Sequence, residues 1–426
     1  MVVEVQVARV AGLDIGKSEL MACVRVPAGD TLPGRGTSRV VGERRQVVRR
    51  FKTFTGGLRA LARWLGDCGV TEVVMEATGQ YWKPVWYQLE DHAGYELKLV
   101  NAAHVRFLPG RKTDVADAVW LAELLEHGLL RGSFVPPAPI RELRDLTRYR
   151  RKLVQAHTAE SQRVSKTLED AGIKLDSVAS DVLGVSGRAM LAALIAGERD
   201  PVVLAGLARG RLRSKIPELT QALEGRFGDH HRLMLQVSLE HLTQLESSIT
   251  TLEAETERVI APFARARDHL DTIPGVGARA AEAIIAEIGV DMSVFPTAAH
   301  LASWACMCPG NNVTGGKRRS GKTRAGSPWL RDTLIEAAWA ASHTKHTYLS
   351  AQFWRLARRI GKKKAAVAVG HSILVIAWHL LHDDLDYHDL GPDYFNTIAS
   401  TSRRRDRAVR ELTSLGYTVT LEEAVA

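Results

Sequence analysis

The sequence predicts an α/β domain at the N-terminus, followed by a helical middle region and a mainly helical C-terminal domain. Strand-like and helix-like segments alternate over residues 1–137, which is typical of a domain that combines a sheet with helices. Beyond this stretch the strand-like alternation is absent, and apolar residues recur at helical spacing. We therefore expect domains at 1–137, 138–262 and 263–391, and a polar tail at 392–426.

The first domain is expected to begin with two strands and a third extended segment. Residues 10–15 form a short apolar run, and Gly16 and Lys17 turn the chain after it. The next segment alternates, which predicts a strand with one apolar face: Leu20, Ala22, Val24 and Val26. Residues 40–51 again favour an extended conformation.

Helices and strands then alternate to the end of this domain. Apolar residues at i, i+3, i+4 and i+7 predict a helix: Leu58, Leu61, Ala62 and Leu65. A strand over 73–76, a helix from about Pro84, a strand over 97–100 and a helix over 114–130 follow. Three prolines then mark a linker: Pro136, Pro137 and Pro139.

A heptad spacing dominates the middle region. Its positions step by three and four: Leu235, Ser238, Leu242, Leu245, Ile249, Leu252, Thr256, Val259 and Phe263. This pattern is typical of a coiled coil that joins subunits, and equally typical of a long helix in a bundle within one chain. Residues 172–228 contain glycines and show no regular periodicity, so the pattern assigns no elements there.

Several features bear on the cellular location. Residues 365–381 are strongly apolar, but His371, Ser372 and His379 interrupt them, which favours a buried helix over a membrane span. Polar residues near the N-terminus argue against a secretory signal, and the four cysteines are expected to be reduced thiols. We therefore expect a cytoplasmic protein.

The charge favours a polyanionic partner. The 426 residues include 57 Lys and Arg against 48 Asp and Glu, a formal net charge of +9. Residues 311–331 contribute six of these cations and no acid: Lys317, Arg318, Arg319, Lys322, Arg324 and Arg331. Glycines within this stretch indicate a loop that can wrap a phosphate backbone.

Four carboxylates of the first domain suggest a metal site. Asp14 and Glu76 each stand at the carboxyl end of an expected strand. Asp114 and Asp117 lie three residues apart at a helix start, so both can point from one face. Gathered together, such acids suit two Mg²⁺ ions that catalyse displacement at a phosphodiester. Taken singly, Asp114 reads as a helix cap and Asp117 as a solvated helix residue.

Four motifs, in this order, resemble those of the DEDD transposases, the insertion-sequence recombinases related to pilin-gene DNA invertases. They are LDIGK at 13–17, MEATGQY at 75–81, VNA at 100–102 and KTDVADA at 112–118. The resemblance implies an RNase H-like domain of the RuvC kind, in which Asp14, Glu76, Asp114 and Asp117 bind the metal ions. It also implies DNA as substrate, a noncoding guide RNA and a homo-oligomer, a dimer or tetramer.

The second half resembles the C-terminal domain of the same family. TIPGVG at 272–277, followed by an Ala-rich helix, suggests a helix-hairpin-helix-like element, in which Gly275 and Gly277 let the backbone approach a phosphate. A plain turn between bundle helices is the alternative. Where the family carries a serine nucleophile, this chain carries Thr314. Threonine keeps a hydroxyl, although its β-branch stiffens the side chain, and Ser320 is the alternative nucleophile.

The expected function is therefore a Mg²⁺-dependent DNA transposase that cuts and rejoins strands through a covalent intermediate. An inactive or architectural nucleic-acid-binding protein and a RuvC-like nuclease are the alternatives. A sugar kinase of the actin-like superfamily is a remote one, because the second half lacks the adenosine-binding glycine motifs that it needs.

Overall fold

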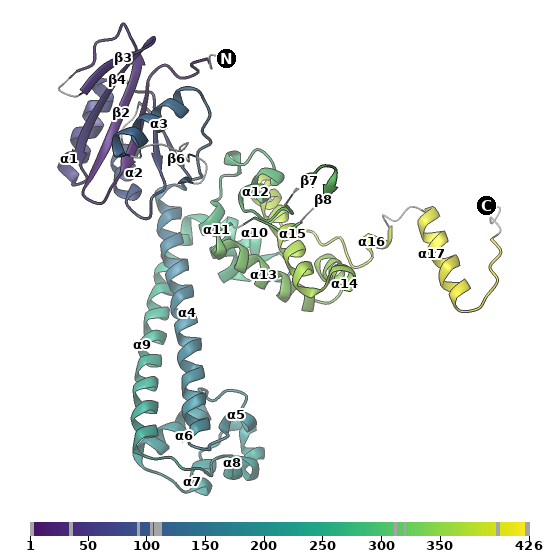
Figure 1. The fold of residues 1–426 in the computed structure, drawn as a ribbon. Coiled ribbons are helices and arrows are strands. Elements are labelled where there is room, and N and C mark those ends of the chain that lie inside the picture. The colour runs from purple at the N-terminus through teal and green to yellow at the C-terminus, as the bar shows by residue number, and fades with distance from the viewer. Residues whose placement is uncertain are drawn as a thin grey trace. The chain divides into compact units, whose positions relative to one another are not determined.

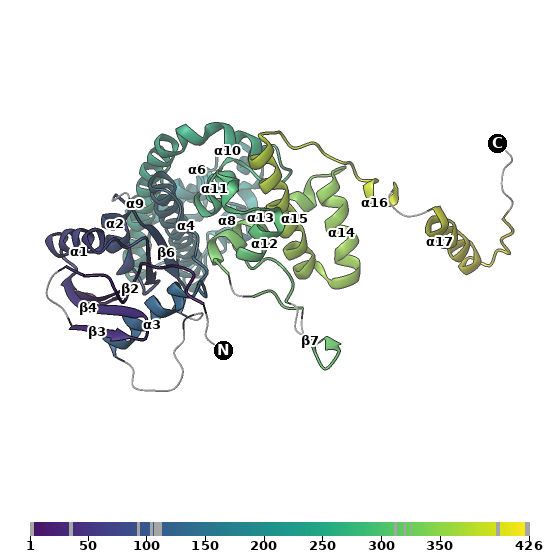
Figure 2. The ribbon, with the colours of Figure 1, turned by 90° about the horizontal axis from the view of Figure 1, so that it is seen from above.

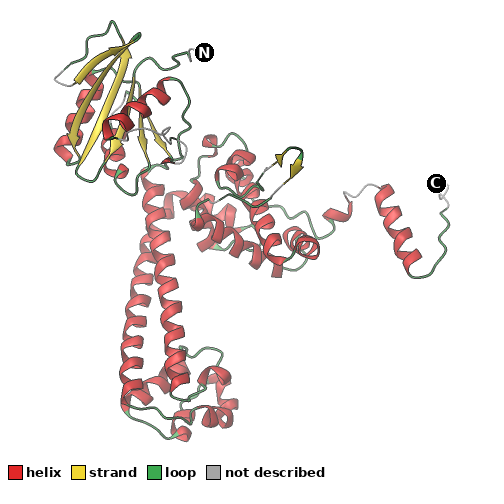
Figure 3. Cartoon of the chain, in the orientation of Figure 1, coloured by secondary structure: helices red, strands yellow, loops and turns green. Residues whose placement is uncertain are grey.

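The computed structural model describes residues 4–33, 37–91, 94–102, 105, 113–310, 313–318, 321–324, 326–397 and 401–421. Its contacts divide the chain into two compact units, Met1–Val135 and Pro136–Ala426. The two units differ in secondary structure, as Figure 3 shows: the main sheet belongs to the first unit, and helices dominate the second. This bears out an α/β region followed by a mostly helical one.

The first unit contains a mixed six-stranded sheet in the order β3-β4-β2-β1-β5-β6. The strands are β1 (Val10–Ile15), β2 (Glu19–Pro27), β3 (Thr37–Val41), β4 (Arg44–Lys52), β5 (Glu72–Glu76) and β6 (Glu96–Val100). Strands β3, β4, β2 and β1 pair antiparallel, whereas β1, β5 and β6 run parallel. The segment expected over 40–51 is thus two strands, because Gly42, at a φ of 59°, turns the chain between them.

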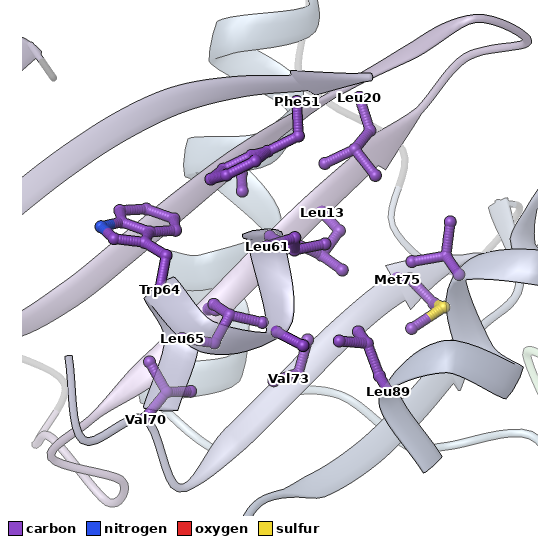
Figure 4. Packing of buried hydrophobic residues seen from close by; sticks show 14 of the residues in the cluster. Leu13, Leu20, Phe51, Leu61, Trp64, Leu65, Val70, Val73, Met75 and Leu89 are labelled. Carbon is purple, nitrogen blue, oxygen red and sulfur yellow. The ribbon is translucent and has the colours of Figure 1, made fainter. Parts of the chain in front are cut away.

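Helices cover both faces of this sheet. They are α1 (Thr55–Asp67), α2 (Trp82–Glu90) and α3 (Asp114–Glu126). One core contains α1 and α2 against the odd-numbered residues of β1, as Figure 4 shows with Leu13, Leu61 and Leu65. The other core packs α3 against the opposite face, where Val10 and Val74 lie. Helix α3 corresponds to the helix that was expected over 114–130, and it ends earlier, at Glu126.

Helix α3 approaches β1 closely because Gly12 has no side chain. A Cβ at Gly12 would lie 2.4 Å from the carbonyl oxygen of Ala118 and 2.5 Å from the amide nitrogen of Ala122. The far end of α3 is held as well, since the carbonyl oxygen of Glu126 accepts from the amides of Gln6 and Val7 at 2.9 and 3.1 Å. Helix α3 therefore runs antiparallel to β1 across the sheet.

A buried ion network fixes the same end of α3. The guanidinium of Arg25 donates through Nε and Nη2 to the two carboxylate oxygens of Glu126, at 2.9 and 3.0 Å. Arg44 donates to Glu126 at 3.0 Å, and Arg25 also donates to Gln46 and Glu123, both at 2.9 Å. Only 1% of Glu126 is exposed. Helix α3 is thereby tied to β2 and β4.

The second unit begins with two long helices, α4 (Ala138–Asp170) and α9 (Asp229–Ile260), which pack side by side (Figure 1). Side-chain contacts show that they are antiparallel. Arg150 pairs with Glu253, whereas Asp170, at the end of α4, contacts the ring of His231 near the start of α9. Most of the heptad seam is buried in this chain: Leu235, Ser238, Leu242, Leu245, Thr256 and Val259. Of the two expected alternatives, these contacts correspond to a long helix packed within one chain.

Residues 172–228 form a small helical lobe at one end of this pair. Its elements are α5 (Leu175–Val178), α6 (Val185–Ala196), α7 (Pro201–Gly206), a 3-10 turn η2 (Gly210–Lys215) and α8 (Ile216–Ala222). They share an apolar core with the ends of α4 and α9, including Leu168, Leu191 and Leu235. The lobe is built from elements of four to twelve residues, too short for a repeating sequence period.

A second helical lobe follows α9. Its elements are η3 (Ala261–Phe263), α10 (Ala264–Asp271), α11 (Ala278–Ile288), η4 (Met292–Val294), α12 (Ala298–Trp304), β7 (Val313–Thr314), β8 (Lys317–Arg318), α13 (Pro328–His343), α14 (Tyr348–Ile360) and α15 (Lys362–Asp383). Two further helices, α16 (Tyr394–Thr397) and α17 (Thr401–Ser414), come after it. Among the described helices, α15 alone is long and apolar enough to cross a membrane. We assign it to the core of the lobe, because it packs against α12, α13 and α14.

Candidate active site

Two of the expected metal ligands stand on neighbouring parallel strands. The register of β1 and β5 pairs Leu13 with Met75, so the next residues, Asp14 and Glu76, lie beside each other at the strand ends. Side chains alternate between the faces of a sheet, and the apolar side chains of these strands that contact α3 are Val10 and Val74. Both acids therefore belong to the face that α3 covers, and both are half-buried.

The other two acids come from the first turn of α3. Because α3 runs antiparallel to β1, its first turn lies at the carboxyl end of that strand. Asp114 is exposed and Asp117 is half-buried. The N-cap of α3 is Thr113, whose side-chain oxygen accepts from the amide of Ala116 at 3.2 Å. A helix-capping role therefore falls to Thr113 and not to Asp114, although both acids also suit the positive end of the helix.

The fold thus brings the four carboxylates to one edge of the sheet from three elements. The described residues contain no group of three or more His, Cys, Asp or Glu gathered closely enough to hold a metal ion. Glu76 accepts a hydrogen bond from Thr78 Oγ1 at 3.3 Å, and Asp14 and Asp117 also have interactions of their own. In chemical terms the set fits Mg²⁺, because carboxylate oxygens are the hard ligands that this ion takes.

Two threonines support this edge and were not among the expected site residues. Thr113 caps the helix that carries two of the acids, and Thr78 bonds to a third. A sequence signal existed for Thr113, since a threonine directly before a helical run with acids in its first turn is typical of a helix start. Thr78 had no comparable signal, because its contact depends on how the chain leaves β5.

The expected nucleophile lies on a hairpin. Thr314 pairs with Lys317 across β7 and β8, and Gly315 and Gly316 form the turn at φ values of 55° and 74°. Positive φ at both central residues is typical of the tight turn that joins two antiparallel strands. The glycines therefore build a hairpin here, where a loop was expected. Thr314 and Lys317 are both exposed, and Figure 2 shows β7 standing away from the helices of its lobe.

The remaining expected phosphate ligands differ in how they are held. Arg319 and Ser320 lie outside the described residues, and Arg318 contributes a backbone pairing with Val313. The carbonyl oxygen of Lys322 accepts from the amide of Gly310 at 3.1 Å, which bridges the chain on either side of the hairpin.

Arg324 has a structural partner. Its Nη2 donates to the carbonyl oxygen and hydroxyl of Ser303, at 3.2 and 3.3 Å, in the last turn of α12. Contact with the negative end of a helix stabilises a guanidinium. Arg324 would therefore have to leave this partner, or share it, to bind a phosphate.

The two glycines of the 272–277 turn serve different purposes. Gly275 has a φ of 88°, and a Cβ there would lie 2.4 Å from the carbonyl oxygen of Ala337 and 2.5 Å from the amide nitrogen of Ala341. Its small size is thus required for packing against α13. Gly277 is the N-cap of α11, and a Cβ there would meet no atom within 4 Å. Of the two, only Gly277 leaves space for a ligand.

Replacing Gly275 by Ala should destabilise the protein by about 3 kcal/mol, because strain at positive φ and overpacking add together. Urea unfolding of the full chain measures this change. Gly277→Ala is the matched control, with an expected cost of about 1 kcal/mol at most. Equal losses in the two variants would contradict the packing role of Gly275.

Comparisons with known proteins match two parts of the chain. Residues 11–173 match a transposase family model of the DEDD type found in IS110 elements. Residues 267–355 match the model of the IS116/IS110/IS902 transposase family. No curated protein matches the chain. The first match spans all four acids, and the second spans the 272–277 turn and the Thr314 hairpin.

Proposed function

The chain belongs to the DEDD transposase family of insertion sequences, and from that premise we propose that four acids and a threonine hydroxyl cut and rejoin DNA. The observation that carries the proposal is the placement of Asp14, Glu76, Asp114 and Asp117 along one edge of the sheet, within the segment that matches the DEDD model. We propose that this domain is RNase H-like and that these acids hold two Mg²⁺ ions.

Each acid has a distinct support. Asp14 and Glu76 extend from adjacent strands of the sheet, whose cores hold the backbone in place. Asp114 and Asp117 lie in the first turn of α3. Hydrogen bonds from the amides of Ala116 and Asp117 to Thr113 hold this turn in helical geometry, so both acids stay on one face of the helix. Bound Mg²⁺ at such a site activates an attacking oxygen and stabilises a leaving oxygen at phosphorus.

We propose that Thr314 is the nucleophile. Its Oγ1 would form a bond to phosphorus while the bond to one strand oxygen breaks, the threonine proton leaves, and the departing strand end becomes a hydroxyl. The energy of the phosphodiester stays in the protein–DNA link, so a new strand end can reverse the step and rejoin DNA. Lys317, directly across the ladder, is within reach of the same phosphate, because paired side chains in antiparallel strands lie about 5 Å apart.

The partners follow from the same premise. DNA is the substrate, and the cations around the hairpin would hold its phosphates. We propose that a noncoding RNA selects the sites by base pairing, and that hydroxyl and acids from different subunits of a dimer or tetramer complete one active site. Function in the cytoplasm, on DNA, fits this chemistry.

Replacing Thr314 by Ala should reduce the covalent protein–DNA adduct about a thousandfold or more, because no other group replaces a lost nucleophile. The assay incubates the full chain with Mg²⁺ and a suicide substrate that traps the adduct, then separates it by denaturing electrophoresis. Thr314→Ser should retain the adduct, since serine keeps the hydroxyl without the β-branch.

Ser320→Ala is the matched control and should leave the adduct unchanged. Persistence of the adduct in Thr314→Ala together with its loss in Ser320→Ala would transfer the nucleophile to Ser320. Tight DNA binding without any adduct from the wild-type protein would instead favour an architectural role.

A further inference from the structure

The lobe at the end of α4 and α9 carries an unexpected cationic surface. Residues 209–215 read RGRLRSK, four cations in seven residues, and residues 201–217 contain no acid. All four side chains, three arginines and one lysine, are exposed. This cluster, which we call the η2 surface, consists of Arg209, Arg211, Arg213 and Lys215. It lies in the stretch to which sequence periodicity assigned no element.

The η2 surface is held in a defined position. Leu212, in the middle of the turn, is partly buried and packs against the core of the lobe. The amide of Arg209 donates to Ser186 Oγ at 2.9 Å, and Lys215 Nζ donates to the carbonyl oxygen of Val178 at 3.1 Å. One apolar anchor between Arg211 and Arg213 therefore leaves both guanidiniums on the solvent side of the turn.

These arginines differ from those of the neighbouring helix. On α4, Arg148 pairs with Glu287, Arg150 with Glu253 and Arg163 with Glu160. Within the part of the chain that the structure describes, Arg209, Arg211 and Arg213 take part in no ion pair. Three unpaired guanidiniums on one short turn create a local positive potential that no acid of the segment offsets.

We propose that the η2 surface is a second nucleic-acid contact, which binds the phosphodiester backbone of DNA or RNA. The proposal rests on the function proposed above, because that function supplies the polyanion. Guanidinium groups bind phosphate oxygens through two parallel hydrogen bonds, and RGRLRSK contains no aromatic residue to stack on a base. The contact therefore adds affinity without reading sequence.

The test measures binding of the full chain to a DNA duplex and to an RNA duplex, each of about 30 base pairs, by fluorescence anisotropy over a range of salt concentrations with EDTA. Arg209→Gln, Arg211→Gln and Arg213→Gln are combined in one variant. Its slope of log K against log salt should fall by about 2 to 3 units, and binding should weaken about tenfold to a hundredfold near 0.15 M salt.

The two duplexes identify the source of the phosphate. A reduced slope with DNA alone assigns the contact to DNA, one with RNA alone assigns it to RNA, and one with both assigns it to either backbone. The matched control removes three exposed cations that already have ion-pair partners: Lys174, Arg232 and Arg258. Changing these three to Gln should move the slope by less than about 1 unit.

An unchanged slope with both duplexes, or an equal decrease in the control, would overturn the η2 contact and leave the proposed function intact. Absence of nucleic-acid binding by the wild-type chain would overturn both. The Asp14→Asn protein separates the two further, because it should lose cleavage and keep the full salt slope. Melting temperatures of all variants confirm that each is folded.

Discussion

Replacing Asp14 by Asn should lower the rate of DNA strand cleavage by about a thousandfold or more, which corresponds to about 4 kcal/mol of lost transition-state stabilisation. Asn has nearly the same shape as Asp, so the side chain still fits beside Glu76 at the end of β1. It lacks the negative charge that a metal ligand supplies, and a neutral amide binds Mg²⁺ more weakly than a carboxylate. The loss should therefore appear in catalysis and not in folding.

Single-turnover cleavage in Mg²⁺ measures this effect, and DNA binding in EDTA should remain close to that of the wild-type protein. Asp67→Asn is the matched control, because Asp67 is an exposed aspartate at the end of α1, on the face opposite α3. It should cleave at the wild-type rate. A normal rate in Asp14→Asn would mean that the four acids are not the metal site.

Replacing Glu126 by Ala should destabilise the first unit by about 3 to 5 kcal/mol, the largest stability loss expected in this protein. The substitution leaves two buried guanidiniums, Arg25 and Arg44, without their shared carboxylate. It also frees the end of α3, and with it the helix that positions Asp114 and Asp117. Urea unfolding of the full chain measures the loss.

Glu123→Ala provides the comparison, because Glu123 contacts the same Arg25 through one oxygen and has a side chain 35% exposed. Solvent weakens such a pair, so the expected cost is about 1 kcal/mol. Losses of similar size at the two positions would show that burial of Glu126 contributes little.

The same network predicts how stability depends on pH. Burial raises the pKa of Glu126, but the hydrogen bonds and charges of Arg25 and Arg44 outweigh it and hold the pKa below its usual range. A carboxyl with a lowered pKa stabilises the folded state at higher pH, and that contribution is lost as the pH falls through the folded-state pKa. Unfolding followed from pH 7 to about pH 3 should therefore show a shallower acid decline in Glu126→Gln than in the wild-type protein.

Patterns of short range predicted much of the first unit. The alternation of Leu20 to Val26 and the spacing of Leu58 to Leu65 both became elements of the expected type. Two short apolar runs, at 10–15 and 73–75, placed Asp14 and Glu76 at strand ends. The structure adds that these strands are adjacent and parallel, so that the two ends lie side by side. The heptad seam predicted the buried face of α9. Its spacing alone did not decide whether that face packs against another subunit or against a helix of the same chain.

Local sequence patterns could not predict contacts between residues that lie far apart in the sequence. Arg25 and Glu126 are 101 residues apart, and nothing near either residue indicates the other. Gly275 resembles a phosphate-binding glycine in sequence, whereas its size is explained by Ala337 and Ala341 of α13, more than sixty residues further along the chain. The 172–228 lobe escaped prediction because each of its short helices acquires a buried face only when the others surround it.

The paired helices α4 and α9 also act as a spacer of fixed length. After Pro139 neither helix contains a glycine or proline, so neither has a built-in hinge. Arg151 contacts α13, and Leu168 lies in the core of the distal lobe, 17 residues further along α4. At 1.5 Å per residue these points are about 25 Å apart, or roughly seven base pairs of duplex. The spacer would therefore fix the distance between two bound segments of one nucleic acid. The length and helical phase of that nucleic acid would decide whether it can contact both lobes at once.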